Sequence, residues 1–232
     1  MYNNKMKLIT VVARYNEDLK WVESLNTDVV IYNKGDSFDF EMPRTDVPNI
    51  GRESETYCRF ILDWYDRLHE YDAVVFLQGD PEGHINEPLE IINSYKKFEI
   101  CYLSSSISFF HITLDKILNN INIFELFRIL KKECNFNTRL YEDHAEWLTE
   151  ETERQYLERI LELISLLKIE VPEKVGWAPG AQFIVPVEYI LNKSIKWWED
   201  LFVLHYIYDQ DEERSLPHII ERLWPVIWMH KT

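Results

Sequence analysis

The sequence is poor in cysteine and glycine, with 3 cysteines and 6 glycines among 232 residues. The cysteines (Cys58, Cys101 and Cys134) are widely spaced and odd in number. They therefore form neither a zinc-binding pattern nor a disulfide framework. This cysteine usage is typical of a reducing compartment, and we expect a cytoplasmic protein.

Basic residues are also scarce. The chain has 25 Lys and Arg against 40 Asp and Glu, a formal net charge of −15, and no run of basic residues longer than two. Because nucleic acids are bound by clustered Lys and Arg, this composition argues against a nucleic acid partner. Charge occurs too early in the N-terminal sequence for a signal peptide, and no apolar run is long enough to span a bilayer. We expect no transmembrane segment, and the oligomeric state stays open.

Strand-like and helical patterns alternate through the first eighty residues. Residues 7–13, 28–32 and 73–77 are unbroken apolar runs rich in β-formers, as in buried parallel strands. A short helix is expected at 18–24, and apolar residues recur at helical spacing from Glu53 onward. This order predicts right-handed crossovers and a parallel sheet.

The rest of the chain predicts additions to the same domain. Residues 86–172 predict a helical insertion, residues 181–185 are strand-like, and helices are expected at 187–204 and from Pro217. We therefore expect a single α/β domain, in which helices flank a Rossmann-like, mostly parallel sheet.

Polar loops follow the three early strands: Arg14–Asp18, Asn33–Gly35 and Gln78–His84. Ligands of parallel sheets bind beyond the carboxyl ends of the strands. We therefore expect the ligand site at this edge, where the three loops meet.

The first loop contains residues suited to a nucleotide. Asn16 and Glu17 can hydrogen-bond a base or ribose, and Arg14 can bind phosphate. The alternative is a plain helix start, with Asn16 as its N-cap and acids in the first turn.

The segment NIGRESETY (49–57) suggests an anion site. Gly51 permits a tight turn, and Arg52 follows at or near a helix start, where backbone N–H groups and a guanidinium bind anions together. The alternative is a surface helix cap, with Ser54 and Glu55 exposed to solvent.

The loop after the third strand, FLQGDPEGH, suggests a metal site. Asp80, Glu82 and His84 can bind a divalent cation that also holds a diphosphate. The alternative is a polar turn built by its glycines and Pro81.

Two segments near the C-terminus complete the candidate site. Trp177 offers a flat face for a sugar or base, and Gly180 gives flexibility before a strand; the alternative for Trp177 is core packing. His218, Glu221 and Arg222 share a helix start, and a partly buried Glu221 would suit a general base. The alternative for Glu221 is a helix-surface ion pair.

Taken together, these blocks resemble a known but uncharacterised domain family. They are ARYNEDLKWV, VVIYNKG, NIGRESETY, VVFLQGDPEGH, WAPGAQFIV and IERLWPVIW, in this order. The resemblance runs nearly from end to end and is weakest between about residues 90 and 170. Several blocks in a fixed order are more specific than any single one.

That family is distantly similar to nucleotide-sugar-dependent glycosyltransferases of the GT-A fold. Those enzymes have a Tyr-Asn-Glu-like loop after the first strand (here 15–17), a Gly/Arg helix start (51–52), an Asp-x-Asp metal motif (78–80) and a Gly-x-x-Phe strand (180–183). In this chain Gln78 replaces the first acid of the metal motif, which weakens metal chelation unless Glu82 or His84 compensates.

The resemblance implies a GT-A-like domain over residues 1–232, with a nucleotide-binding half (1–85), the helical insertion (86–172) and an acceptor-side half (173–232). It implies transfer of a hexose or pentose from a nucleotide diphosphate sugar to a carbohydrate or glycoconjugate acceptor, assisted by Mn²⁺ or Mg²⁺. Glu221 and Asp80 would be catalytic, and Asp80 and His84 would bind the metal. The implied nucleotide-sugar-binding residues are Arg14, Tyr15, Asn16, Glu17, Asn33, Lys34, Arg52, Gln78, Trp177 and Gly180.

Two other functions stay open. One is a metal-dependent hydrolase or nucleotidyltransferase acting on phosphorylated compounds. The other is a non-catalytic sugar- or nucleotide-binding module, which Gln78 favours because an acid of the metal motif is missing.

Overall fold

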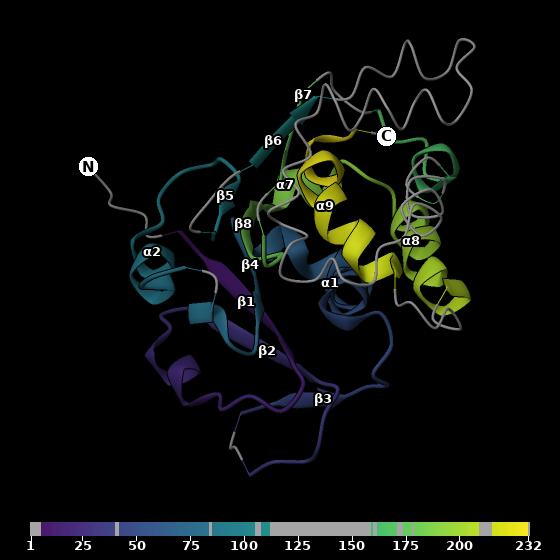
Figure 1. Ribbon diagram of the computed structural model, residues 1–232. Helices are drawn as coiled ribbons and strands as arrows, with labels where there is room; N and C mark the ends of the chain where they lie inside the picture. The colour runs from purple at the N-terminus through teal and green to yellow at the C-terminus, as the bar shows by residue number, and fades with distance from the viewer. Residues whose placement is uncertain are drawn as a thin grey trace, which may run out of the picture.

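A six-stranded sheet forms the centre of the computed structural model (Figure 1). The structure describes residues 6–39, 42–83, 85–104, 108–111, 159, 162–170, 174–177, 179–208 and 215–231. The strand order is β3-β2-β1-β4-β8-β5. The strands are β1 (Leu8–Arg14), β2 (Asp28–Asn33), β3 (Arg44–Asp46), β4 (Ala73–Gln78), β5 (Cys101–Tyr102) and β8 (Phe183–Pro186).

The sheet is mostly parallel. β1 pairs in parallel with β2 and β4, and β2 pairs in parallel with β3. β8 runs antiparallel to both of its neighbours, β4 and β5. The carboxyl ends of β1, β2 and β4 and the amino end of β8 therefore lie at one edge of the sheet.

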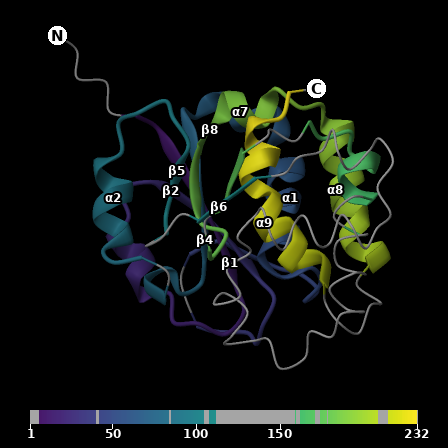
Figure 2. The same cartoon turned by 45° about the horizontal axis from the view of Figure 1, so that its top comes forward.

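Helices cover both faces of the sheet (Figures 1 and 2). On one face lie α1 (Arg52–Trp64), α8 (Ile195–Tyr208) and α9 (Ser215–Met229); on the other lie the 3₁₀ helix η1 (Lys20–Ser24) and α2 (Pro88–Ser94). Side chains alternate along β1, so that Ile9 and Val11 pack under α1 and α9, whereas Leu8 and Val12 face the opposite side. Both faces of β1 are thus buried, as its unbroken apolar sequence predicted.

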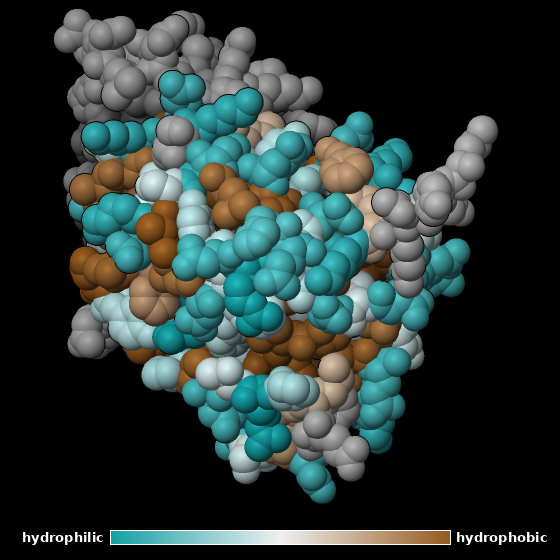
Figure 3. Space-filling view, turned by 180° about the vertical axis from the view of Figure 1, so that it is seen from behind, coloured by the Kyte–Doolittle hydropathy of each residue, from teal (hydrophilic) through white to brown (hydrophobic). Residues whose placement is uncertain are grey.

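The remaining described elements are short. They are η2 (Tyr65–Glu70), η3 (Pro81–Gly83), α7 (Val187–Leu191) and a separate antiparallel ribbon of β6 (Ser108–His111) and β7 (Lys174–Trp177). Among the described helices, none is long and apolar enough to cross a membrane. Hydrophilic side chains cover most of the face seen in Figure 3, with hydrophobic ones in separate groups between them.

Aromatic side chains fix how α9 sits on the sheet. Trp224 and Trp228 stack with ring centroids 4.6 Å apart, and Trp228 lies 5.2 Å from Phe76 of β4. Tyr57 of α1 lies 4.9 Å from the same Phe76 ring. These rings are buried and serve as core. Because this face of α9 is anchored to the sheet, the orientation of Glu221, one turn before Trp224, is fixed as well.

The predicted strands and helices are largely confirmed, with a few differences. The helix expected at 187–204 is split into α7 and α8. The range expected to be a helical insertion (86–172) includes β5, which belongs to the main sheet, and β6. Residues 112–158 of that range lie outside the described residues. β5 and β3, with two and three residues, are too short to show a periodic pattern, and β7 was not predicted either.

Candidate functional site

Arg14, at the end of β1, fastens the loops after β1 and β2 to each other. Its guanidinium donates to the carbonyl oxygens of Glu17 (3.0 Å), Tyr15 (3.1 Å) and Asp36 (3.0 Å), and to Asn33 Oδ1 (2.5 Å). The side chain is buried and packs 3.7 Å from the ring centroid of Phe38. Arg14 therefore shapes this edge of the sheet from within.

The Glu17 carboxylate connects the first loop to the loop after β4. Glu17 Oε2 accepts the backbone N–H groups of Tyr15 (2.7 Å) and Asn16 (3.1 Å). The same oxygen would lie 2.3 Å from a Cβ added to Gly79, so the Glu17 carboxylate packs directly against this glycine. Trp21 Nε1 also donates to the Gly79 carbonyl (2.9 Å). The Tyr15 side chain, 52% exposed, points outward from this joined pair of loops.

Asn33 and Lys34, at the end of β2, are buried and hydrogen-bonded within the protein. Asn33 donates to Asp46 Oδ1 (2.8 Å) on β3. The Lys34 ammonium donates to the carbonyl of Ile50, to the carbonyl of Arg52 (2.6 Å) and to the carboxylate of Glu55 (2.7 Å). An ammonium has three donors, so all the donors of Lys34 are engaged.

Arg52, the first residue of α1, faces α9 instead of the first two loops. Its Nη1 lies 3.3 Å from His218 Nε2, and its Nε lies 3.8 Å from the Glu53 carboxylate. Because a guanidinium always donates, Nε2 of His218 accepts in this contact, and the imidazole proton is then on Nδ1. That nitrogen lies 3.8 Å from Glu221 Oε2.

Glu221 is held against the start of β8. Its Oε1 accepts the backbone N–H of Gly180 (3.0 Å), and the carbonyl of Gly180 accepts Gln78 Nε2 (2.8 Å) from the end of β4. Gly180 has a φ of 93°, a conformation that favours glycine. The Glu221 side chain is 18% exposed. It is therefore anchored by a backbone group and still reaches the surface.

A second carboxylate, Glu53, belongs to the same cluster and was not singled out from the sequence. Burial raises the pKa of the Glu53 carboxyl, and the nearby Arg52 only partly opposes this. Burial also raises the pKa of Glu221, but His218, the Gly180 N–H and Arg222 outweigh it, and the pKa is lowered from its ordinary value. Two neighbouring carboxyl groups whose pKa values are pushed in opposite directions are typical of acid–base sites.

The sequence signal that could have identified Glu53 as buried is its helical spacing. It lies four residues before the buried Tyr57, on the apolar face of α1. The alternative for this segment, a surface helix cap with Ser54 and Glu55 exposed to solvent, is wrong, since both residues are fully buried. Glu55 accepts Lys34, and also Arg59 at 2.5 Å, which stabilises its charge in the core.

Two buried polar atoms near this cluster, Tyr57 Oη and Trp224 Nε1, have no hydrogen-bond partner among the described residues. The charges of Glu53 and Glu221 add to the effect of burial in raising the pKa of Tyr57, so its hydroxyl lies near both carboxyl groups.

The predicted metal site stays a prediction, because His84 lies outside the described residues. Asp80 is exposed after β4, and Glu82 is exposed in η3. Among the described residues, no group of three or more His, Cys, Asp or Glu that could hold a metal ion occurs. The side chain of Trp177 also lies outside the described part of the chain, although its backbone belongs to β7.

The remaining predicted residues form one continuous series of contacts along the edge of the sheet. Glu17 contacts Gly79, the neighbouring Gln78 bonds Gly180, and Gly180 bonds Glu221. From Glu221 the series continues to His218 and then to Arg52. The edge thus carries the exposed Tyr15 side chain at the first loop, and Glu221, His218, Arg52 and Glu53 together between α1 and α9.

The chain was compared with known proteins. Residues 9–232 match a family described as "Protein of unknown function (DUF3431)". No curated protein and no solved structure matches the chain.

Proposed function

Since the chain belongs to this family of unknown function, its chemistry has to be argued from the site, and we propose that it is a glycosyltransferase. The substrate would be a nucleotide diphosphate sugar, and the acceptor a molecule with a free hydroxyl. The observation that carries the proposal is Glu221, a carboxylate anchored by the Gly180 N–H at the carboxyl edge of a mostly parallel sheet. Ligands bind at this edge in such sheets.

Glu221 is placed for the role of general base by its position and not by a raised pKa, which the sequence had suggested. Despite burial, its pKa is lowered by His218, the Gly180 N–H and Arg222, so the carboxylate is ionised at neutral pH and can accept a proton, as a weaker base than an unperturbed Glu. Its Oε2 lies 3.8 Å from His218 Nδ1. In the proposed step, Glu221 accepts the proton of the acceptor hydroxyl while that oxygen bonds to the anomeric carbon. The bond from this carbon to the diphosphate oxygen breaks, and the nucleoside diphosphate leaves with the electron pair.

The first loop would bind the nucleoside. The half-exposed Tyr15 ring offers a flat face for a base, and Glu17, whose carboxylate orders the Tyr15 and Asn16 amides, holds the loop in one shape. Arg14 and Lys34 would act indirectly, because both side chains are buried and hydrogen-bonded within the protein. For Arg14 this changes the expected role from phosphate contact to support of the loops.

A divalent cation would assist the departure of the nucleoside diphosphate. Asp80 and His84 would supply its protein ligands, and a bound divalent cation would neutralise charge on the leaving diphosphate. The described residues do not fit a complete metal site, so the step above uses none.

The test is an assay of sugar transfer with a panel of nucleotide sugars and acceptors, with and without manganese. We expect Glu221→Gln to lower kcat by at least about a hundredfold while the affinity for the nucleotide is kept. The control is Glu188→Gln, which removes an exposed carboxylate from α7. Equal turnover by wild-type protein and Glu221→Gln would refute this role.

The same assay separates the two other functions. Release of phosphate or pyrophosphate without an acceptor would indicate a hydrolase or nucleotidyltransferase. Nucleotide or sugar binding without any turnover would indicate a binding module. An Asp80→Ala change should abolish manganese-dependent nucleotide binding without unfolding the protein, and unchanged affinity in this variant would exclude Asp80 as a metal ligand.

A further inference from the structure

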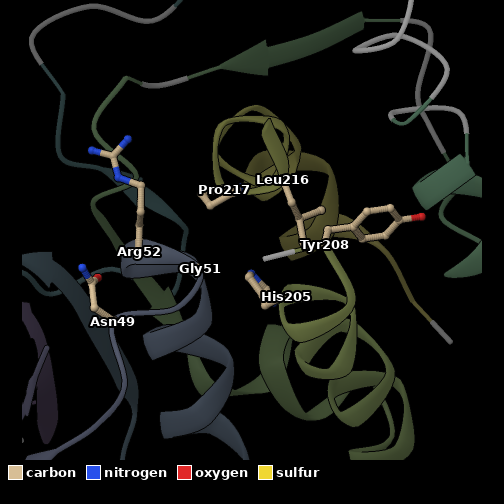
Figure 4. A pocket seen from close by; sticks show the side chains of 7 residues that line it. All are labelled: Asn49, Gly51, Arg52, His205, Tyr208, Leu216 and Pro217. Atoms are coloured by element: carbon tan, nitrogen blue, oxygen red, sulfur yellow. The ribbon is translucent and has the colours of Figure 1, made fainter. Parts of the chain in front are cut away.

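A small pocket lies directly beside the acid–base cluster, between the start of α1, α8 and the start of α9 (Figure 4). Its volume is about 140 Å³. Asn49 and Arg52 stand on one side of it, and His205, Leu216 and Pro217 stand on the other. Gly51 and Tyr208 complete the lining.

The lining is positively charged, through Arg52, although the chain as a whole is strongly acidic. None of these lining residues is acidic, although the chain has 40 Asp and Glu. The Arg52 side chain is 51% exposed, so a ligand can reach the guanidinium. His205 contributes a neutral, polar wall, because burial lowers its pKa to about 4. A guanidinium and an amide in a wall that includes no acidic residue favour an oxyanion.

Neighbouring contacts make this wall more favourable to negative charge. The Lys34 ammonium donates to the carbonyl oxygens of Ile50 and Arg52, on either side of Gly51. Its positive charge offsets the partial negative charge of these oxygens. Two buried carboxyl groups lie near this wall, those of Glu55 and Glu53. Glu55 is itself paired with Lys34 and Arg59. Glu53 lies 3.8 Å from Arg52 Nε, and burial raises its pKa, which favours its neutral form. Both groups therefore repel an anion less than a free carboxylate would.

The size of the pocket limits what it can hold. Whole ligands of drug size occupy pockets of roughly 300–1,000 Å³, so this one is too small for a nucleotide sugar. A phosphate or carboxylate with a few attached carbon atoms fits. Glycine is required at its wall, since a Cβ on Gly51 would lie 2.7 Å from His205 Cδ2.

We infer that this pocket binds an oxyanion, a phosphate or carboxylate, carried by the acceptor substrate. The assignment of the ligand as the acceptor substrate rests on the proposed function, whereas anion binding by the pocket does not. Arg52 both lines the pocket and contacts His218, which lies beside Glu221. An acceptor held by its anionic group at Arg52 would therefore be bound beside Glu221.

Binding of inorganic phosphate and of acetate, measured by calorimetry without any nucleotide sugar, tests the anion site. We expect Arg52→Gln to weaken binding of the preferred anion about tenfold or more, because a charge-assisted bond is lost. Asn49→Asp should weaken it several-fold by placing a carboxylate in the wall. The matched control is Asn26→Asp, the same exposed charge change at the opposite end of the sheet, which should leave affinity unchanged.

The outcomes separate this inference from the proposed function. Stronger binding of phosphate than of acetate identifies a phosphorylated ligand, and the reverse identifies a carboxylate. If neither anion binds, or if both Arg52→Gln and Asn49→Asp bind like the wild type, the pocket is not an anion site, whatever the transfer assay shows. Glu221→Gln should keep anion binding while it loses transfer. If sugar transfer occurs but anionic acceptors react no faster than neutral ones, the acceptor assignment is wrong and the transferase proposal stands.

Discussion

Replacing Lys34 by methionine separates a structural from a ligand-binding role at the end of β2. All three donors of the ammonium are engaged, two of them by backbone carbonyls beside the start of α1 and one by Glu55. Methionine has similar length and flexibility but no donor. The change therefore leaves two carbonyl groups and one buried carboxylate without their partner.

The expected loss can be estimated from the burial of this ion pair. The Lys34 and Glu55 side chains are 4% and 0% exposed. Removing one partner of a buried pair costs about 3–5 kcal/mol. Glu55 keeps Arg59 and Tyr206 as donors, which places the expected loss at the lower end, about 3 kcal/mol. For a chain of this length, that loss corresponds to a decrease in Tm of roughly 6–12 °C.

Urea unfolding followed by tryptophan fluorescence measures this loss. The matched control is Lys20→Met, since Lys20 is 84% exposed and lies 3.7 Å from an exposed carboxylate. The control should change the free energy of unfolding by less than about 0.5 kcal/mol. If Lys34→Met unfolds like the wild type but loses nucleotide affinity, Lys34 is a ligand-binding residue and the reasoning above is wrong.

Two further perturbations test the packing around the candidate site. His205 is buried with a pKa lowered from 6.5 to about 4, so the unfolded chain takes up its proton first as the pH falls. The free energy of unfolding therefore keeps its full value above about pH 6.5 and decreases down to about pH 4, by about 2 kcal/mol between pH 6.5 and 5. In His205→Gln, the free energy of unfolding, measured in urea at these pH values, should decrease less steeply with falling pH. An equal slope in the two proteins would contradict the assignment. Gly35→Ala should cost about 1–3 kcal/mol, because the added Cβ would lie 1.5 Å from the Tyr15 carbonyl oxygen. Gly83→Ala, whose nearest contact would be 3.6 Å, is its control, and equal stability of the two variants would contradict the close approach.

The elements of the sheet were predictable because their sequences carry the signal of burial. β1, β2 and β4 each have a mostly apolar sequence with polar residues at their ends, and they lie within one residue of the predicted positions. The short strands β3 and β5 carry no such signal, since they have three and two residues and depend on their neighbours for pairing. Their positions follow from the sheet as a whole.

The roles of polar residues at the edge were less predictable. The sequence identified Arg14, Lys34 and Arg52 as cations near strand ends and suggested phosphate contacts for Arg14 and Arg52. In the structure, Arg14 and Lys34 are buried and bind loop carbonyls, and Arg52 alone is half-exposed. Whether a cation faces solvent or the protein depends on carbonyl groups of other loops, which a linear pattern does not place.

By itself, the sequence determined which segments become buried strands and helices, and thereby which edge of the sheet carries the polar loops. This follows from the spacing of apolar residues, which is a local property of the chain. Only the tertiary structure decided that Arg52 meets His218, 166 residues away, and that the Gly180 N–H meets Glu221, 41 residues away. Those contacts depend on the antiparallel entry of β8 and on the aromatic packing that orients α9, both of which join distant parts of the chain.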